Sequence, residues 1–92
     1  MHADQPDLAR RIVDELAGTM PATTHLADIT DDQLTAVGQL AIQRRRDDKD
    51  VIGKIAAEYV QHRKKTWRET ADMFGMNHMT LYRWAQPFLG ST

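Results

Sequence analysis

The segment around Gly75 holds more helix-boundary signals than any other part of this 92-residue chain. Thr66 and Glu69 have the spacing of a capping box, which starts a helix by satisfying its free N–H groups. Gly75 follows, and glycine readily takes the left-handed conformation that ends a helix. Asn77 is suited to cap a second helix, and Pro87 cannot continue it. The segment is therefore expected to form two short helices joined by a turn of three to four residues.

The apolar residues of this segment fit two helices that cross steeply. Trp67, Ala71 and Phe74 fall on one face of the first helix, and Leu81 and Trp84 fall on one face of the second. Ala71 is small enough to let the two helices approach closely. This combination of caps, turn glycine and apolar spacing is the helix-turn-helix pattern.

The string Trp67-Arg68-Glu69-Thr70-Ala71, followed by Gly75 and Leu81-Tyr82-Arg83-Trp84, resembles the homeodomain-like helix-turn-helix modules. Similar strings occur in DNA-inverting serine recombinases, in tetracycline-repressor-type regulators and in small bacterial, phage and plasmid regulators. Thr70 departs from the family, which carries a buried Ile or Val there. We expect either weaker packing at Thr70 or a hydrogen bond between its hydroxyl and the backbone. Six residues follow Gln86, too few for a β-hairpin, so no wing is expected.

The resemblance implies that the second helix enters the major groove of double-stranded DNA. Because Leu81 and Trp84 face the core, the opposite face and the start of this helix would meet the bases. Arginine can read guanine, glutamine can read adenine, and methionine can pack on a thymine methyl group. The candidates for reading bases are Asn77, His78, Met79, Tyr82, Arg83 and Gln86. The candidates for phosphate contacts, at or near the starts of the two helices, are Lys64, Lys65, Thr66, Arg68 and Thr80.

The remaining sequence predicts further helices and no strand. Pro6 is placed at the first position of a helix whose apolar stripe runs from Leu8 to Leu16, and Gly18 ends it. No stretch alternates apolar and polar residues, and no hairpin dipeptide is present. The predicted fold is a small all-α domain with a C-terminal helix-turn-helix. Within a single domain of residues 1–92, residues 1–46 would form N-terminal helices and residues 49–90 the DNA-binding region.

Two more helices are expected between residues 31 and 64. Thr30 and Gln33 form a second capping box, and a separate apolar pattern begins at Val51. The polar residues between these patterns include no glycine or proline, so one continuous helix roughly 50 Å long is the alternative. We expect a break near residues 47–50, with Asp48 or Asp50 as the cap of the later helix.

Charge is distributed unevenly along the chain, although the net charge is only −1. Residues 1–36 carry two basic and seven acidic side chains, whereas residues 37–92 carry ten basic and six acidic ones. An acidic front and a basic back are compatible with a polyanionic partner for the back half. The run Arg44-Arg45-Arg46 is interpreted as a solvated helix end rather than as part of that interface.

Catalysis, metal binding and cofactor binding are not expected. The chain has no cysteine, its single serine is next to the C-terminal end, and its four histidines lack the spacing of metal ligands. Asp47-Asp48-Lys49 matches a fragment of some metal-dependent nucleases, but their carboxylates are carried on strands. No apolar run approaches the roughly 18 residues of a membrane span, and the first 20 residues lack the layout of a signal peptide. A cytoplasmic protein is therefore expected.

These observations predict sequence-specific binding of double-stranded DNA, with transcriptional regulation as the most direct role. Two other classes stay open. One is a protein–protein interaction module, such as an antitoxin or a polymerase adaptor, and the other is a plasmid or phage protein that coats or segregates DNA. A homodimer through residues 5–45 is also expected, because the Leu8–Leu16 stripe would find little core if the helix-turn-helix packs mainly on residues 51–60.

Overall fold

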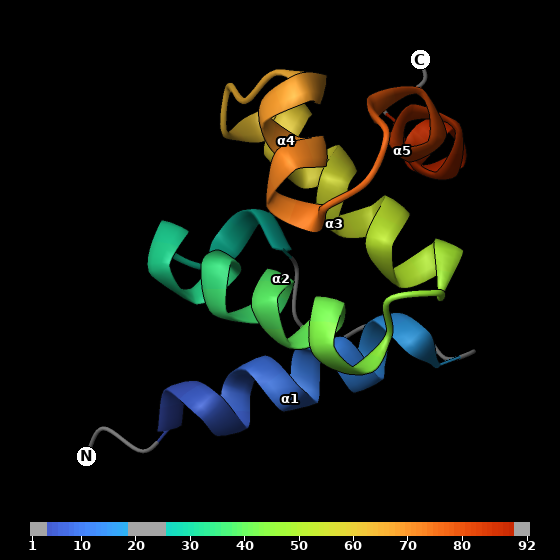
Figure 1. The fold of residues 1–92 in the computed structure, drawn as a ribbon. Coiled ribbons are helices and arrows are strands. Elements are labelled where there is room, and N and C mark those ends of the chain that lie inside the picture. Colours follow the sequence, from blue (N-terminus) through green and yellow to red (C-terminus); the bar gives the residue numbers. More distant parts are fainter. Residues whose placement is uncertain (1–3, 19–25, 90–92) are drawn as a thin grey trace.

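The computed structural model describes residues 4–18 and 26–89, and this part of the chain is all-α, as predicted. Figure 1 shows α1 at one end of the molecule, α4 and α5 at the other, and α2 and α3 between them. Its helices are α1 (Asp4–Ala17), α2 (Asp31–Arg44), α3 (Lys49–His62), α4 (Trp67–Phe74) and α5 (His78–Ala85). Short 3₁₀ turns span Leu26–Asp28 and Gln86–Phe88.

No helix in the described ranges is long and apolar enough to cross a membrane. The predicted absence of a wing concerns residues after Leu89 and lies outside the described residues.

Most helix boundaries follow from local capping. Thr30 and Gln33 form the expected capping box at the start of α2. The break between α2 and α3 is confirmed, because the Asp48 carboxylate accepts hydrogen bonds from the backbone N–H groups of Asp50 and Val51. One prediction was wrong in position: α1 begins at Asp4, so Pro6 is its third residue rather than its first. A proline fits there because the N–H groups of a first helical turn have no intrahelical partner.

The apolar stripe of α1 is buried inside the chain. Ala9, Ile12, Val13 and Leu16 are all buried, and α1 packs mainly on α2 and also on α3. The expectation that this stripe would lack a core within the chain was wrong. The predicted homodimer therefore loses the argument that led to it, although the structure does not test the dimer itself.

Helix α3 connects the two ends of the core. It packs on α1, α2, α4 and α5, and its most extensive contact is with α5. Gly53 lies at that contact, where a Cβ atom would stand only 2.3 Å from the carbonyl oxygen of Trp84. The missing side chain thus lets the backbones of α3 and α5 approach closely. Apolar periodicity alone does not mark Gly53, although a glycine inside a helix often has a packing reason.

Candidate nucleic-acid interface

Helices α4 and α5 begin and end at the capping residues that the sequence predicts. Thr66 and Glu69 form the capping box of α4, with both of its hydrogen bonds present. Gly75 ends α4 in the left-handed conformation, with φ 64° and ψ 37°. Asn77 then caps α5, and its side-chain oxygen accepts a hydrogen bond of 2.8 Å from the N–H of Met79. Each of these predicted boundaries is confirmed.

Thr70 stands where the helix-turn-helix modules that the sequence resembles carry a buried Ile or Val. Its side chain is fully buried, and its hydroxyl donates a hydrogen bond of 2.8 Å to the carbonyl oxygen of Thr66. A buried hydroxyl without such a partner would be costly, and this bond satisfies the donor. Of the two expectations for Thr70, the structure shows the bond to the backbone.

The apolar residues predicted for the core of the motif lie in it or against it. Ala71, Phe74 and Leu81 are buried, and Trp67 and Trp84 are partly buried against the core. The angle between α4 and α5 is therefore filled, and one face of α5 is free to meet a partner.

The residues proposed to read bases lie on α5 and at its two ends, where Asn77 and Gln86 stand, and they differ in exposure. Met79 and Tyr82 are 65% and 44% exposed. His78 is half-buried, as is the phosphate candidate Thr80. The other base-reading candidates, which are exposed, are Asn77, Arg83 and Gln86.

An aromatic contact joins the exposed face of α5 to the start of α4. The rings of Trp67 and Tyr82 meet edge to face, with centroids 5.2 Å apart and an interplanar angle of 86°. Because Trp67 is the first residue of α4, this contact brings Tyr82 toward the cations that precede α4. The base-reading candidate Tyr82 therefore lies against the start of α4, which the phosphate candidates Lys64 and Lys65 precede in the chain.

The other phosphate candidates lie at the start of α4 and are exposed. They are Lys64, Lys65, Thr66 and Arg68. Lys64 has a positive φ of 60°, and the backbone N–H of Lys65 donates a hydrogen bond to the carbonyl oxygen of Tyr59. These features at the end of α3 fix the direction in which the chain continues toward α4. The backbone N–H of Thr66 already donates to Glu69 and is not free for a phosphate. That bond, with the one from the Thr66 hydroxyl and the nearby Lys65 charge, lowers the pKa of Glu69.

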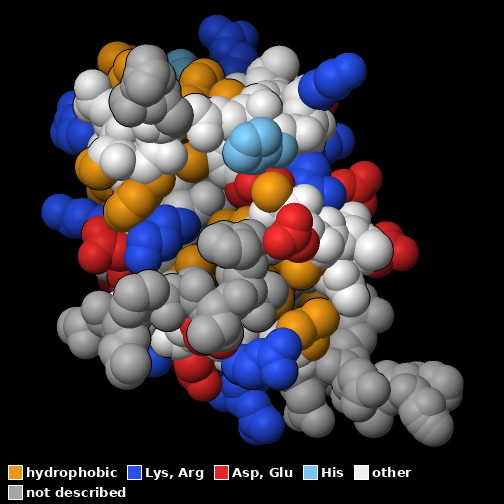
Figure 2. Space-filling model, turned by 180° about the vertical axis from the view of Figure 1, so that it is seen from behind, with side chains coloured by type: hydrophobic (Ala, Val, Ile, Leu, Met, Phe, Trp, Pro, Cys, Tyr) orange, Lys and Arg blue, Asp and Glu red, His pale blue; other side chains and the backbone are white. Residues whose placement is uncertain are grey.

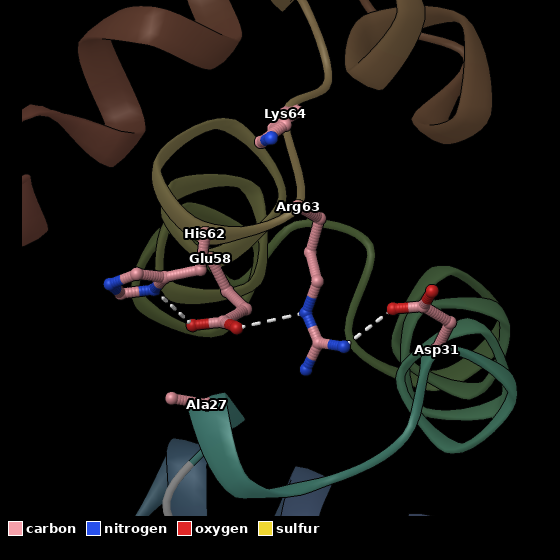
Figure 3. A pocket seen from close by; sticks show the side chains of 6 residues that line it. All are labelled: Ala27, Asp31, Glu58, His62, Arg63 and Lys64. Carbon is pink, nitrogen blue, oxygen red and sulfur yellow. Dashed lines mark hydrogen bonds and ion pairs between the residues drawn. The ribbon is translucent and has the colours of Figure 1, made fainter.

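A cluster of ionic side chains anchors the end of α3 (Figure 3). Glu58 is buried and accepts hydrogen bonds from Arg63 Nε at 3.0 Å and, on its other oxygen, from His62 Nδ1 at 2.8 Å when that nitrogen is protonated. Arg63 also pairs with Asp31 and donates to two backbone carbonyl oxygens just before α2. Burial alone would lower the pKa of Arg63, but its bonds to Asp31 and Glu58 raise it.

This cluster borders a cavity of about 340 Å³, but the polar groups of the cluster are largely hydrogen-bonded to one another. Every nitrogen of the Arg63 guanidinium donates a hydrogen bond to another group of the chain, so the role of the cluster is structural. It holds α3 to the segment before α2 and thereby places Lys64 and Lys65. Within the described ranges, no group of three or more acidic or histidine side chains could hold a metal ion.

Charge is not uniform over the surface. In the view of Figure 2, the charged side chains at the upper end, where α4 and α5 lie, are mostly Lys and Arg. Acidic side chains lie mainly in the middle and lower parts of that face. In this view the charged side chains around α4 and α5 are therefore mostly basic, although Lys and Arg also occur lower on the same face.

Comparison with protein-family models, with curated proteins and with solved structures finds no match for this chain. Function is therefore inferred from the residues and geometry of α4 and α5.

Proposed function

We propose that this protein binds double-stranded DNA sequence-specifically through α4 and α5 and acts as a transcriptional regulator. The observation that carries the proposal is the exposed face of α5. It combines hydrogen-bonding side chains with an exposed methionine, and it is connected through the Trp67–Tyr82 contact to cations at the start of α4. This is a set of groups that a major groove and its phosphate walls can accommodate together.

In this proposal each part of the interface has a distinct task. Arg83 forms two hydrogen bonds with a guanine, Gln86 reads an adenine, and Met79 packs against a thymine methyl group. Lys64 and Lys65 contact phosphates and set the register without reading sequence. The tight α3–α5 contact keeps the recognition helix rigid on the core. No catalytic step or cofactor is involved, and the protein would act in the cytoplasm of a bacterial cell, on host, phage or plasmid DNA.

A homodimer remains part of the proposal, for a reason that concerns affinity. A single module of this kind buries only about 600–1,000 Å² on DNA, and two copies would double the contacts. Because the α1 stripe is covered by its own chain, a dimer through residues 5–45 would have to use the outer surfaces of α1 and α2. Light scattering at tens of micromolar measures the mass, and a monomer that still binds DNA would rule this part out.

A protein–protein interaction module is the second candidate, and the exposure of Met79 and Tyr82 favours it. Exposed apolar side chains on one helix face also suit a protein partner. A DNA-coating or segregation protein would use the same helices as the main proposal but spread along the duplex, which footprint length would reveal.

The deciding experiment selects bound sequences from a random duplex pool and then compares two variants. Arg83→Ala should lower affinity for the selected site by about 1–3 kcal/mol and relax preference at one base pair. Lys65→Ala should weaken selected and random duplexes alike and reduce the salt slope by about one unit. Both side chains are exposed, so both variants should keep the circular dichroism of the parent.

The outcomes separate the candidates. If Arg83→Ala weakens all sequences equally, Arg83 is a phosphate contact and the recognition face is misassigned. If the unchanged protein binds no duplex at low salt, the DNA-binding proposal fails and the protein-interaction module takes its place.

A further inference from the structure

Arg46 reaches the turn of the helix-turn-helix from a distant part of the sequence. It lies in the connection between α2 and α3, outside the segment that resembles a DNA-binding module. A Cβ atom built on Gly75 would lie 3.6 Å from Nη2 of Arg46. The guanidinium therefore stands beside the turn that leads into α5.

No protein group accounts for this position of Arg46. The residue is exposed, and its side chain makes no hydrogen bond or ion pair within the part of the chain that the structure describes. The nearby Asp48 carboxylate is engaged in capping α3. A cation next to the negative end of the α2 dipole is favourable anywhere around that end, so the dipole alone does not direct Arg46 toward Gly75.

Cations then stand at both ends of α4. Lys65 comes just before the first residues of α4, and Arg46 lies beside Gly75, which ends this helix. The eight residues of α4 span about 12 Å, which is about the width of the major groove. With α5 in the groove and α4 lying across it, one cation would be near each phosphate wall.

We propose that Arg46 is a second phosphate anchor, which contacts the strand opposite to the one contacted by Lys65. This inference rests on the proposed DNA binding and adds the α2–α3 connection to the interface. It changes the interpretation of the Arg44-Arg45-Arg46 run, whose last member becomes part of a clamp across the groove. The anchor carries no sequence information, because a phosphate is the same at every base pair.

The first test measures the salt dependence of binding to selected and random duplexes. Arg46→Ala should weaken both by the same factor and reduce the slope of log affinity against log salt by about 0.9, the value for one phosphate contact. Lys49→Ala is the matched control, because it removes the same charge from an exposed position three residues away, outside both the proposed DNA contacts and residues 5–45. That variant should leave the slope unchanged. Equal slopes for Arg46→Ala and the unchanged protein would overturn the anchor.

The second test assigns the strands. Single uncharged methylphosphonate groups are placed in turn along each strand of the selected duplex. Arg46→Ala should lose sensitivity to substitution at a position on one strand, and Lys65→Ala at a position on the other strand across the same groove. Lost sensitivity on the same strand, or at no position for Arg46→Ala, would overturn the clamp while the proposed function stands. Absence of duplex binding by the unchanged protein would overturn both.

Discussion

A methyl group added at Gly53 tests how firmly α3 holds the proposed recognition helix. In Gly53→Ala the new Cβ would stand 2.3 Å from the carbonyl oxygen of Trp84 and 3.2 Å from the nitrogen of Ala85. Real Cβ atoms essentially never come within 3.0 Å of such atoms, so the Trp84 carbonyl must retreat by at least about 0.7 Å. Because the obstacle is backbone rather than a flexible side chain, α5 itself has to move.

The expected effect is the difference between two opposing terms. Overpacking a core typically costs about 1–3 kcal/mol, and the rigid backbone contact places Gly53→Ala near the upper end. Alanine is favoured over glycine inside a helix by about 1 kcal/mol, which offsets part of that cost. The net loss in the free energy of unfolding is therefore about 2 kcal/mol, which lowers the Tm by about 10 °C in a domain of this size.

Gly38→Ala is the matched control. Gly38 is also buried inside a helix, but a Cβ atom there would lie 3.7 Å from the Tyr59 hydroxyl, an ordinary contact. Only the helix-propensity gain remains, so this variant should be more stable than the parent by up to about 1 kcal/mol. Urea unfolding followed by circular dichroism measures both. If Gly53→Ala is as stable as Gly38→Ala, the backbones of α3 and α5 do not approach as closely in solution as the structure indicates.

Three further predictions concern the ends of α3 and α4. Arg63→Ala should cost about 3–5 kcal/mol in urea unfolding, because it leaves the buried Glu58 carboxylate without its main partner; a loss below 1 kcal/mol would mean that water replaces the arginine. The pKa of Glu69 is lowered in the folded state, so its contribution to stability is present above the ordinary glutamate pKa and is lost as the pH falls through the folded value. Thermal melts between pH 6 and pH 3 should therefore be less pH-dependent for Glu69→Gln, and identical profiles would count against the capping box. Lys64→Gly should raise stability by about 1 kcal/mol, because glycine takes a positive φ without strain; the same variant should weaken binding to all duplexes equally, and a base-specific effect would contradict the phosphate role.

Local chemistry was readable from the sequence. The capping boxes at Thr30 and Thr66, the left-handed Gly75 and the Asp48 cap all act through hydrogen bonds or backbone angles within a few residues. Their consequences do not depend on the rest of the fold, so helix type and most helix ends could be predicted. The start of α1 was misplaced because proline is tolerated throughout a first turn.

Apolar periodicity was informative about faces but not about partners. It identified the buried stripe of α1 correctly, yet it could not show that α2 and α3 cover this stripe. A periodic pattern of apolar residues indicates only that one face of a helix is buried. The prediction that another copy of the chain would cover it followed from the assumption that the helix-turn-helix uses most of α3, whereas α3 is buried along most of its length by several helices.

Within the described residues, the order of amino acids was thus enough to predict five helices, the N-terminal caps of α2 to α5 and the motif around Gly75. Only the packing of the elements shows that Gly53 meets the backbone of Trp84, that Arg63 joins Glu58 to Asp31, and that Arg46 stands beside Gly75. Each of these contacts joins residues from different elements. Their distances depend on how helices cross, and many crossing geometries satisfy the same apolar pattern.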